Sequence, residues 1–186
     1  GSQSRQRLTP PHAARVFLAL WPDEAVAMAL WRHGQKLHQH CGGRLTAREN
    51  LHLTLVFIGN VAVGKLSGLE GVAGAISATA FEFVVDQTDY WKHNGIVWAA
   101  PRIVPQPLRQ LVAALESALL NAGYKFDVRS YVPHMTLIRN ARAPSALPAI
   151  ELPWRVAEFS LVESVRDAHA SRYRVVARWP LASVAR

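Results

Sequence analysis

The chain contains one short pattern twice, as His52-Leu53-Thr54-Leu55 and as His134-Met135-Thr136-Leu137. Each copy consists of a histidine, an apolar residue, a threonine and a leucine, and each begins an apolar run. Successive side chains of a β-strand point to opposite faces of its sheet. Each copy therefore predicts a strand that buries its apolar residues and presents histidine and threonine on the other face. The repeat also suggests an old duplication that gave two similar lobes.

Two such strands can place two imidazoles across a cleft, which suits acid–base chemistry because one imidazole accepts a proton while the other donates one. The two threonine hydroxyls can donate hydrogen bonds to negative charge that develops in a transition state. The candidate catalytic residues are therefore His52, His134, Thr54 and Thr136. A single His-x-Thr sequence is common by chance, so the second copy in a similar context makes the pattern informative.

The remaining sequence predicts an α+β fold. Helical periodicity covers about residues 23–40 and 105–121, and a weaker helix rich in Gly and Ala covers about 63–78. Asp23 is the predicted N-cap of the first helix, and Asn94-Gly95 is a predicted hairpin turn. Strands are predicted over residues 15–20, 51–58, 81–91, 95–100, 134–139, 154–164 and 172–179, and 141–153 is predicted to be a loop. This order lacks the regular strand–helix alternation of a parallel sheet.

Half of the 186 residues are apolar, so the chain can bury a sizeable core. We expect residues 1–11 to be a disordered tail or tag remnant, and 12–186 to form a single domain. No apolar run approaches the ~20 residues of a membrane helix, and the N-terminal stretch has no apolar signal-peptide core. The single Cys41 excludes an intramolecular disulfide and suits a cytoplasmic location.

The chain has a basic balance, with 21 Lys and Arg against 13 Asp and Glu, and most of the basic residues are arginines. Arginine suits bidentate contacts to phosphate, although net charge alone is weak evidence for a nucleic-acid partner.

Both motifs and their surroundings resemble the 2H phosphoesterases, in particular the RNA 2',3'-cyclic phosphodiesterases, also called 2'-5' RNA ligases. The similar segments extend from Arg15 to the end of the chain and include residues 15–22, 49–59, 131–139, 160–164 and 173–181. The resemblance implies two lobes with antiparallel sheets flanked by helices. It further implies that a pseudo-two-fold axis relates the lobes and that the active-site cleft lies between them.

The same resemblance implies a metal-independent hydrolase without a cofactor that opens RNA 2',3'-cyclic phosphate ends to 2'-phosphates. It implies His52 as the proton donor to the departing 3' oxygen and His134 as the acceptor that activates water, although the sequence itself does not assign these roles. Reversible 2'-5' ligation is available to the same site in principle. The expected partners are RNA ends or nucleotides carrying a 2',3'-cyclic phosphate, with no membrane and no obligate protein partner.

Three further residues are candidates for substrate binding. Phe57 and Arg139 each lie five residues after a motif histidine, at offsets where the family places functional residues. Strict alternation would put both on the face opposite the histidines, which argues against this role, although strand ends often twist or bulge. Tyr131 has a polar tip close to the second motif.

Other functions are also compatible with the sequence. The first is a phosphodiesterase for 2',5'-linked oligonucleotides or small cyclic nucleotides, and the second is a non-catalytic RNA-end binding protein. The third is a metallo-phosphoesterase that uses the cluster at one helix end, which contains His33, His38, His40 and Cys41. The spacing of these residues does not place them on one helix face, which argues against a metal site.

Overall fold

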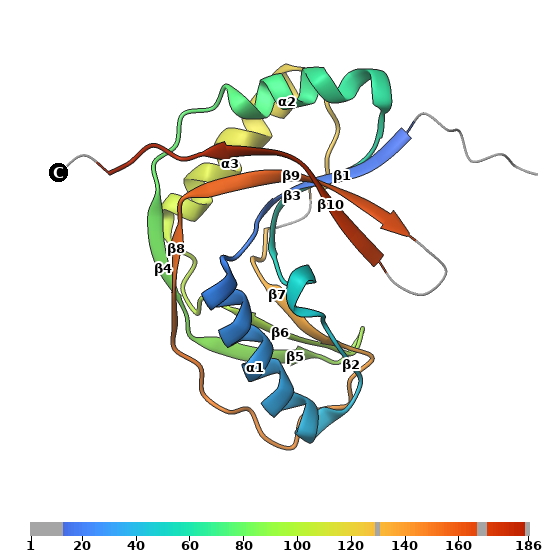
Figure 1. Cartoon of the computed structure of the whole chain (residues 1–186), viewed down its shortest axis with the longest axis vertical. Coiled ribbons are helices and arrows are strands. Elements are labelled where there is room, and N and C mark those ends of the chain that lie inside the picture. Colours follow the sequence, from blue (N-terminus) through green and yellow to red (C-terminus); the bar gives the residue numbers. More distant parts are fainter. Residues whose placement is uncertain (1–12, 129–130, 167–170, 185–186) are drawn as a thin grey trace, which may run out of the picture.

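A computed structural model describes residues 13–128, 131–166 and 171–184. Two antiparallel four-stranded sheets dominate it (Figure 1). The first sheet has the strand order β10-β9-β1-β3, formed by β1 (Ala13–Leu20), β3 (Leu53–Ala62), β9 (Glu158–Arg166) and β10 (Ser171–Pro180). The second sheet has the order β2-β7-β6-β5, formed by β2 (Arg44–Leu45), β5 (Gln87–Trp91), β6 (Ile96–Ala100) and β7 (Met135–Arg139).

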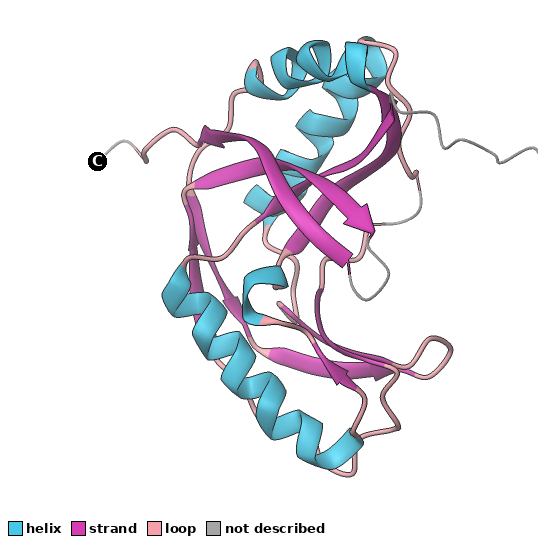
Figure 2. Cartoon of the chain, turned by 45° about the vertical axis from the view of Figure 1, so that its right-hand side comes forward, coloured by secondary structure: helices cyan, strands magenta, loops and turns pink. Residues whose placement is uncertain are grey.

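The helices flank these sheets. They are α1 (Glu24–Cys41), α2 (Leu66–Gly74) and α3 (Gln106–Asn121), with short 3₁₀ turns η1 (Arg48–Asn50) and η2 (Val63–Lys65). The α2 and α3 helices lie at the end of the molecule that holds the first sheet, and α1 lies beside the second sheet (Figure 2). A separate antiparallel pair joins β4 (Phe81–Val85) to β8 (Leu152–Val156). The predicted α+β fold with antiparallel sheets is confirmed. Among the described residues, no helix is both long and apolar enough to cross a membrane.

The two sheets are not the two halves of the chain. The first sheet combines strands from both ends of the sequence, whereas the second is built from its middle. The motif strands β3 and β7 nevertheless belong to different sheets, as the cleft arrangement requires.

The predicted N-cap of the first helix and the predicted helical periodicity of residues 105–121 are both confirmed. The Asp23 side chain caps α1 by accepting a hydrogen bond from the backbone N–H of Val26 at 2.9 Å. The apolar stripe of α3 is buried along its whole length, at Leu108, Leu111, Val112, Leu115 and Leu119. These side chains join one large apolar cluster that also takes in buried residues of both four-stranded sheets.

Two predicted strands are wrong because each is divided between two sheets. The segment 81–91 breaks at Asp86, whose carboxylate accepts a hydrogen bond from the backbone N–H of Arg102 at 2.7 Å. The segment 154–164 breaks at Ala157, and β8 begins inside the predicted 141–153 loop. The helix predicted over 63–78 is shortened to η2 and α2. Neither break contains a glycine or a proline, the residues that most often interrupt a strand.

The first motif strand, β3, contains a β-bulge at Leu55. Ala19 of β1 pairs with Thr54, whereas the preceding Leu18 pairs with Val56, which leaves Leu55 without a partner residue. Both Leu55 and Val56 are buried. The bulge therefore places two successive side chains on the core side and shifts the alternation by one residue.

The second motif strand has the same irregularity at the equivalent leucine. Trp98 of β6 pairs with Thr136 and Val97 pairs with Ile138, so Leu137 is the extra residue. Leu137 and Ile138 are both buried. In each strand, the residue five positions after the histidine thereby returns to the face of the histidine and the threonine.

Gly43 holds the end of α1 against β7. Its φ is +84°, and a Cβ at this position would lie 2.5 Å from the carbonyl oxygen of Arg139 and 2.9 Å from Ile138 Cγ2. Gly43→Ala should therefore destabilise the protein by about 2–4 kcal/mol, since a left-handed backbone and a backbone clash are both costly. The measurement is urea unfolding followed by tryptophan fluorescence.

Gly71→Ala is the matched control, because Gly71 lies inside α2 and a Cβ there would have no atom within 4 Å. This substitution should raise stability by about 0.5–1 kcal/mol through helix propensity. Equal stability of the Gly43→Ala variant and the wild type would contradict the tight contact.

Candidate active site

A cavity of about 310 Å³ contains both predicted histidines and both predicted threonines. Its walls come from β3, β7, the 44–50 segment and the start of β10. The lining residues are Arg44, Leu45, Thr46, Ala47, Asn50, His52, Thr54, His134, Thr136, Arg139, Ser171 and Tyr173. Strands of both sheets thus supply the polar groups of a single cavity.

Each motif histidine is anchored by a backbone carbonyl two residues earlier. His52 Nδ1 lies 2.7 Å from the oxygen of Asn50, and His134 Nδ1 lies 3.0 Å from the oxygen of Val132. A carbonyl oxygen can only accept, so each Nδ1 must carry the proton. The Nε2 atom of each neutral ring is then left unprotonated, and it is the atom that can exchange protons in the cavity.

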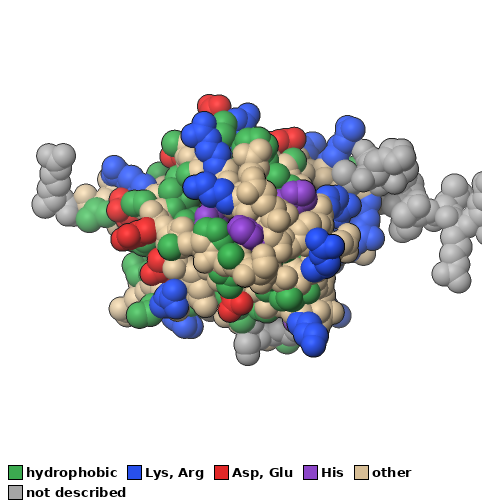
Figure 3. All heavy atoms as spheres, turned by 90° about the horizontal axis from the view of Figure 1, so that it is seen from below, with side chains coloured by type: hydrophobic (Ala, Val, Ile, Leu, Met, Phe, Trp, Pro, Cys, Tyr) green, Lys and Arg blue, Asp and Glu red, His purple; other side chains and the backbone are tan. Residues whose placement is uncertain are grey.

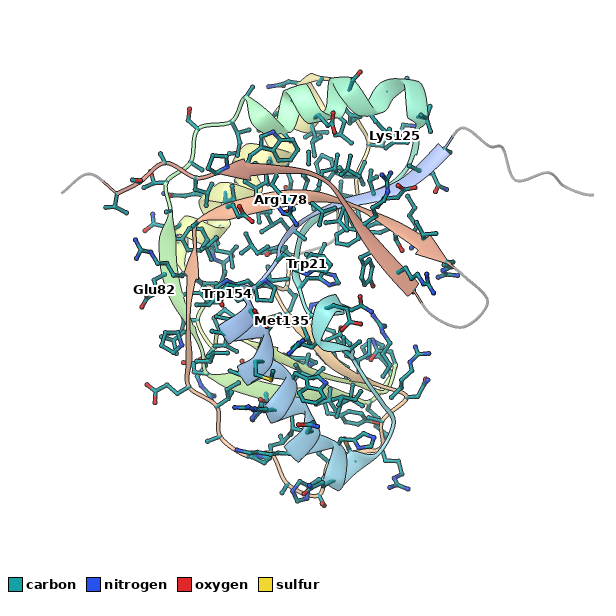
Figure 4. The ribbon with its side chains drawn as sticks, viewed as in Figure 1. Trp21, Glu82, Lys125, Met135, Trp154 and Arg178 are labelled. Atoms are coloured by element: carbon teal, nitrogen blue, oxygen red, sulfur yellow. The ribbon has the colours of Figure 1, made fainter. Side chains whose placement is uncertain are left out.

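His52 is surrounded by aromatic rings. The Trp21 ring stacks on it with a centroid distance of 4.7 Å and an interplanar angle of 7°. Phe17 and Tyr173 contact the same imidazole at 5.2 and 5.0 Å. Trp21 is itself held by a hydrogen bond from its Nε1 to the carbonyl of Glu49 at 3.2 Å, and it lies between the two four-stranded sheets (Figure 4). The aromatic packing fixes the plane of the ring.

His134 has a similar but less enclosed environment. The Trp91 and His134 rings make a T-shaped contact with a centroid distance of 4.7 Å and an interplanar angle of 69°. Trp91 in turn packs against Trp98 at 5.2 Å. One tryptophan therefore supports each motif histidine: Trp21 directly follows β1, and Trp91 ends β5 of the second sheet.

Both imidazoles have lowered basicity in the free protein. Burial lowers the pKa of His52 to about 4, against the opposing effect of its bond to Asn50, and the charges of Arg139 and His134 lower it further. Burial also lowers the pKa of His134, with Arg139 adding to the effect. Both rings are consequently neutral near pH 7, and a bound anion would raise both pKa values by opposing the arginine charge.

The threonines and Arg139 complete the polar groups expected from the sequence. Within the described part of the chain, the side chains of Thr54, Thr136 and Arg139 have no hydrogen-bond partner. They line the cavity together with the two histidines. Their donors are therefore available to a ligand.

The structure places Phe57 and Tyr131 outside this cavity lining. Phe57 lies on the same sheet face as Phe17, as the bulge requires, but the guanidinium of Arg15 covers its ring at 4.9 Å. Tyr131 donates a hydrogen bond from its hydroxyl to the carbonyl of Thr54 at 3.3 Å, and burial raises its pKa. Tyr131 thus supports the backbone of the first motif instead of lining the cavity.

Four residues that shape the site were missed in the sequence. They are Trp21, Arg44, Trp91 and Tyr173. None of the four carries a local pattern that distinguishes it from ordinary strand or loop residues. Their proximity depends on strand pairings between distant segments, which the sequence alone does not specify.

The histidine-rich end of α1 does not form a common site. His33 Nε2 meets the hydroxyl of Thr88 at 2.9 Å, His38 Nε2 meets the carbonyl of Gly43 at 2.9 Å, and His40 Nδ1 meets the hydroxyl of Ser145 at 3.2 Å. The face where α1 ends shows the histidine side chains as separate areas among hydrophobic side chains and backbone, with arginines and lysines nearby (Figure 3). Across residues 13–128, 131–166 and 171–184, no group of three or more His, Cys, Asp or Glu side chains is placed to hold a metal ion.

Comparison with known proteins places this geometry in a family. The family model described as the 2'-5' RNA ligase superfamily matches residues 22–168. An RNA 2',3'-cyclic phosphodiesterase of Escherichia coli (strain K12) is 35% identical over 141 residues, which cover 75% of this chain and 80% of that protein. Another of Thermotoga maritima is 28% identical over 131 residues, which cover 67% of this chain and 69% of that protein.

Solved structures agree with this result. The crystal structure of E. coli LigT complexed with 3'-AMP superimposes with a TM-score of 0.81 at 30% identity, covering 91% of this chain and 98% of that chain. The resemblance that the two motifs carried is thus confirmed over most of the sequence. The chain belongs to the 2'-5' RNA ligase superfamily.

Proposed function

We propose that this protein is a metal-independent RNA 2',3'-cyclic phosphodiesterase that opens the cyclic ester to a 2'-phosphate. The observation that carries the proposal is the paired anchoring of His52 and His134. Each Nδ1 donates to a backbone carbonyl, and each Nε2 is left for a cavity that also contains Thr54 and Thr136. The relatives from E. coli and T. maritima are named for this activity, which supports the same substrate here.

The reaction needs two proton transfers around one phosphorus atom. His134 accepts a proton from water, and the water oxygen forms a new bond to phosphorus. The bond from phosphorus to the 3' oxygen breaks, and His52 donates a proton to that oxygen. The products are a 2'-phosphate and a 3'-hydroxyl, and Thr54 and Thr136 donate hydrogen bonds to the non-bridging oxygens as their charge grows.

The assignment of donor and acceptor follows the family resemblance. His52 can act as donor only when protonated, and its pKa of about 4 keeps it neutral in the free protein near pH 7. The proposal therefore requires that the bound phosphate, through its negative charge, raise the pKa of His52. With a 5'-hydroxyl as the nucleophile in place of water, the same two proton transfers would form a 2'-5' bond and release the 3'-hydroxyl. A cytoplasmic location remains a prediction that rests on the single Cys41.

The direct test is incubation with an RNA that ends in a 2',3'-cyclic phosphate, followed by mapping of the product. A 2'-phosphate supports the proposal, and a 3'-phosphate overturns its regiochemistry. Parallel incubations with a 2',5'-linked oligonucleotide and with a 3',5'-cyclic nucleotide test the rival substrates. Activity that is lost on addition of EDTA would favour a metallo-phosphoesterase, and binding without turnover would favour a non-catalytic RNA-end binding protein.

His52→Ala and His134→Ala should each lower turnover by about two to four orders of magnitude, because each removes one proton transfer. The double variant should lose less than the sum of the single effects, because residues that act as a unit are not additive. The measurement is steady-state kinetics on the cyclic-phosphate RNA. His40→Ala, which changes a histidine near the end of α1 that does not line the cavity, is the control for histidine loss. Near-normal turnover of either motif variant would exclude the paired mechanism.

Thr54→Val and Thr136→Val keep the side-chain shape but remove the hydroxyl. Turnover should fall by about tenfold or more with little change in substrate affinity, because the lost hydrogen bonds strengthen only in the transition state. Kinetics and thermal unfolding should be measured on the same preparations. Reduced thermal stability with normal turnover would show that the hydroxyls have a structural role.

The pH dependence should differ between kcat/KM and kcat. The rate rises with pH as the base, His134, loses its proton, and it falls as the acid, His52, loses its own. The profile of kcat/KM reports the pKa values of the free enzyme. These are about 4 for His52 and below 6.5 for His134, so kcat/KM should decline above about pH 6.5. In the bound complex the phosphate raises both pKa values, so the kcat profile should lie about one pH unit or more higher. Coincident profiles would contradict this linkage.

A further inference from the structure

The cavity carries an excess of positive groups. Arg44 and Arg139 line it, and its lining contains no aspartate or glutamate. In the part of the chain that the structure describes, neither guanidinium takes part in a salt bridge or a side-chain hydrogen bond. The site is therefore built for more negative charge than the protein itself supplies.

The two arginines that line the cavity are neighbours across a strand pair. Arg44 of β2 and Arg139 of β7 are partner residues in the antiparallel ladder. Like charges directly opposite each other destabilise a sheet pair, so an anion between the guanidiniums would relieve a real repulsion. Gly43 permits this close pairing, because its lack of a Cβ lets the 42–45 segment lie against the backbone of Arg139.

The pair is displaced from the reacting centre along β7. The bulge at Leu137 leaves two ordinary strand steps between Thr136 and Arg139, which is about 7 Å at roughly 3.3 Å per residue. One ribose can span such a separation between two phosphates. The motif histidines and threonines serve the cyclic phosphate, so the arginine pair is positioned for a second phosphate on the same nucleotide.

We propose that Arg44 and Arg139 bind the 5'-phosphate of the terminal nucleotide, so that the protein acts on phosphorylated chain ends in preference to nucleoside 2',3'-cyclic phosphates. This inference rests on the proposed function and adds its substrate class. A 2',3'-cyclic phosphate carries a single negative charge, whereas a nucleotide within an RNA chain adds a second at its 5' side. Two planar guanidiniums can bind that second phosphate with several charge-assisted hydrogen bonds.

The test compares two substrates that differ only in that phosphate: adenosine 2',3'-cyclic phosphate with and without a 5'-phosphate. The wild type should show a kcat/KM about tenfold or more higher for the 5'-phosphorylated compound, in line with the strength of charge-assisted hydrogen bonds. Arg44→Ala should remove most of this preference by lowering kcat/KM for the 5'-phosphorylated compound. Arg44→Lys should restore only part of it, because lysine lacks the planar fork.

Arg142→Ala is the matched control. Arg142 is an exposed arginine close to the same edge, where its guanidinium approaches Gly42, but it does not line the cavity. This variant should keep the wild-type ratio of kcat/KM between the two substrates. Any difference in rate between this variant and the wild type should disappear at high salt, because salt screens long-range attraction. Equal effects of Arg44→Ala and Arg142→Ala would mean that a diffuse basic surface acts on both substrates, which would overturn the proposal.

Two further outcomes would also overturn the inference: a wild type without preference, or an Arg44→Ala variant with equal losses on both substrates. A binding titration separates this inference from the proposed function, because it does not depend on turnover. Adenosine 2',5'-bisphosphate should bind more tightly than adenosine 2'-monophosphate, and Arg44→Ala should reduce that difference. Absence of turnover with this binding difference intact would refute the proposed activity alone, and equal affinities would refute the second phosphate site.

Discussion

Each imidazole in the cavity donates its Nδ1 proton to the carbonyl two residues before it, and both rings therefore present the same atom to a ligand. This hydrogen bond selects the tautomer, because a carbonyl cannot donate. It also leaves Nε2 to accept a proton from one group or return it to another. Without this anchoring, two histidines near a phosphate would be only a polar pair. With it, both rings are held in a fixed orientation that suits proton transfer at Nε2, and each packs against a tryptophan, Trp21 or Trp91.

The bulges at Leu55 and Leu137 explain why each motif reaches further than its four residues. A regular strand would turn Phe57 and Arg139 into the core, five positions after each histidine. The extra residue restores both to the cavity-facing side of their sheets, with different consequences. Arg139 enters the cavity, where its charge lowers the pKa of both histidines. Phe57 is covered by Arg15, so the two equivalent positions have diverged.

The sequence predicted those parts of the site that depend on local alternation. His52, Thr54, His134 and Thr136 share a cavity because each pair occupies one face near the start of a motif strand. The breaks at Asp86 and Ala157 were not predicted, because a single Asp or Ala inside a strand-like segment does not show that the chain leaves one sheet for another. Trp21, Arg44 and Tyr173 were missed for a related reason. Trp21 directly follows β1, Arg44 belongs to β2 and Tyr173 to β10, and only the pairing of distant segments brings these elements beside the motif strands.

The charge of the cavity links substrate binding to proton transfer. Burial already disfavours the charged imidazoles, and the nearby Arg139 adds to this effect in the free protein. A phosphate that neutralises the guanidinium removes that contribution, and a second phosphate in the cleft attracts a proton to the imidazoles directly. An anion held by Arg44 and Arg139 would therefore do more than increase affinity. It would help to supply the protonated histidine that the proposed reaction needs. His52 would then be protonated when a chain end is bound and neutral in the empty cleft.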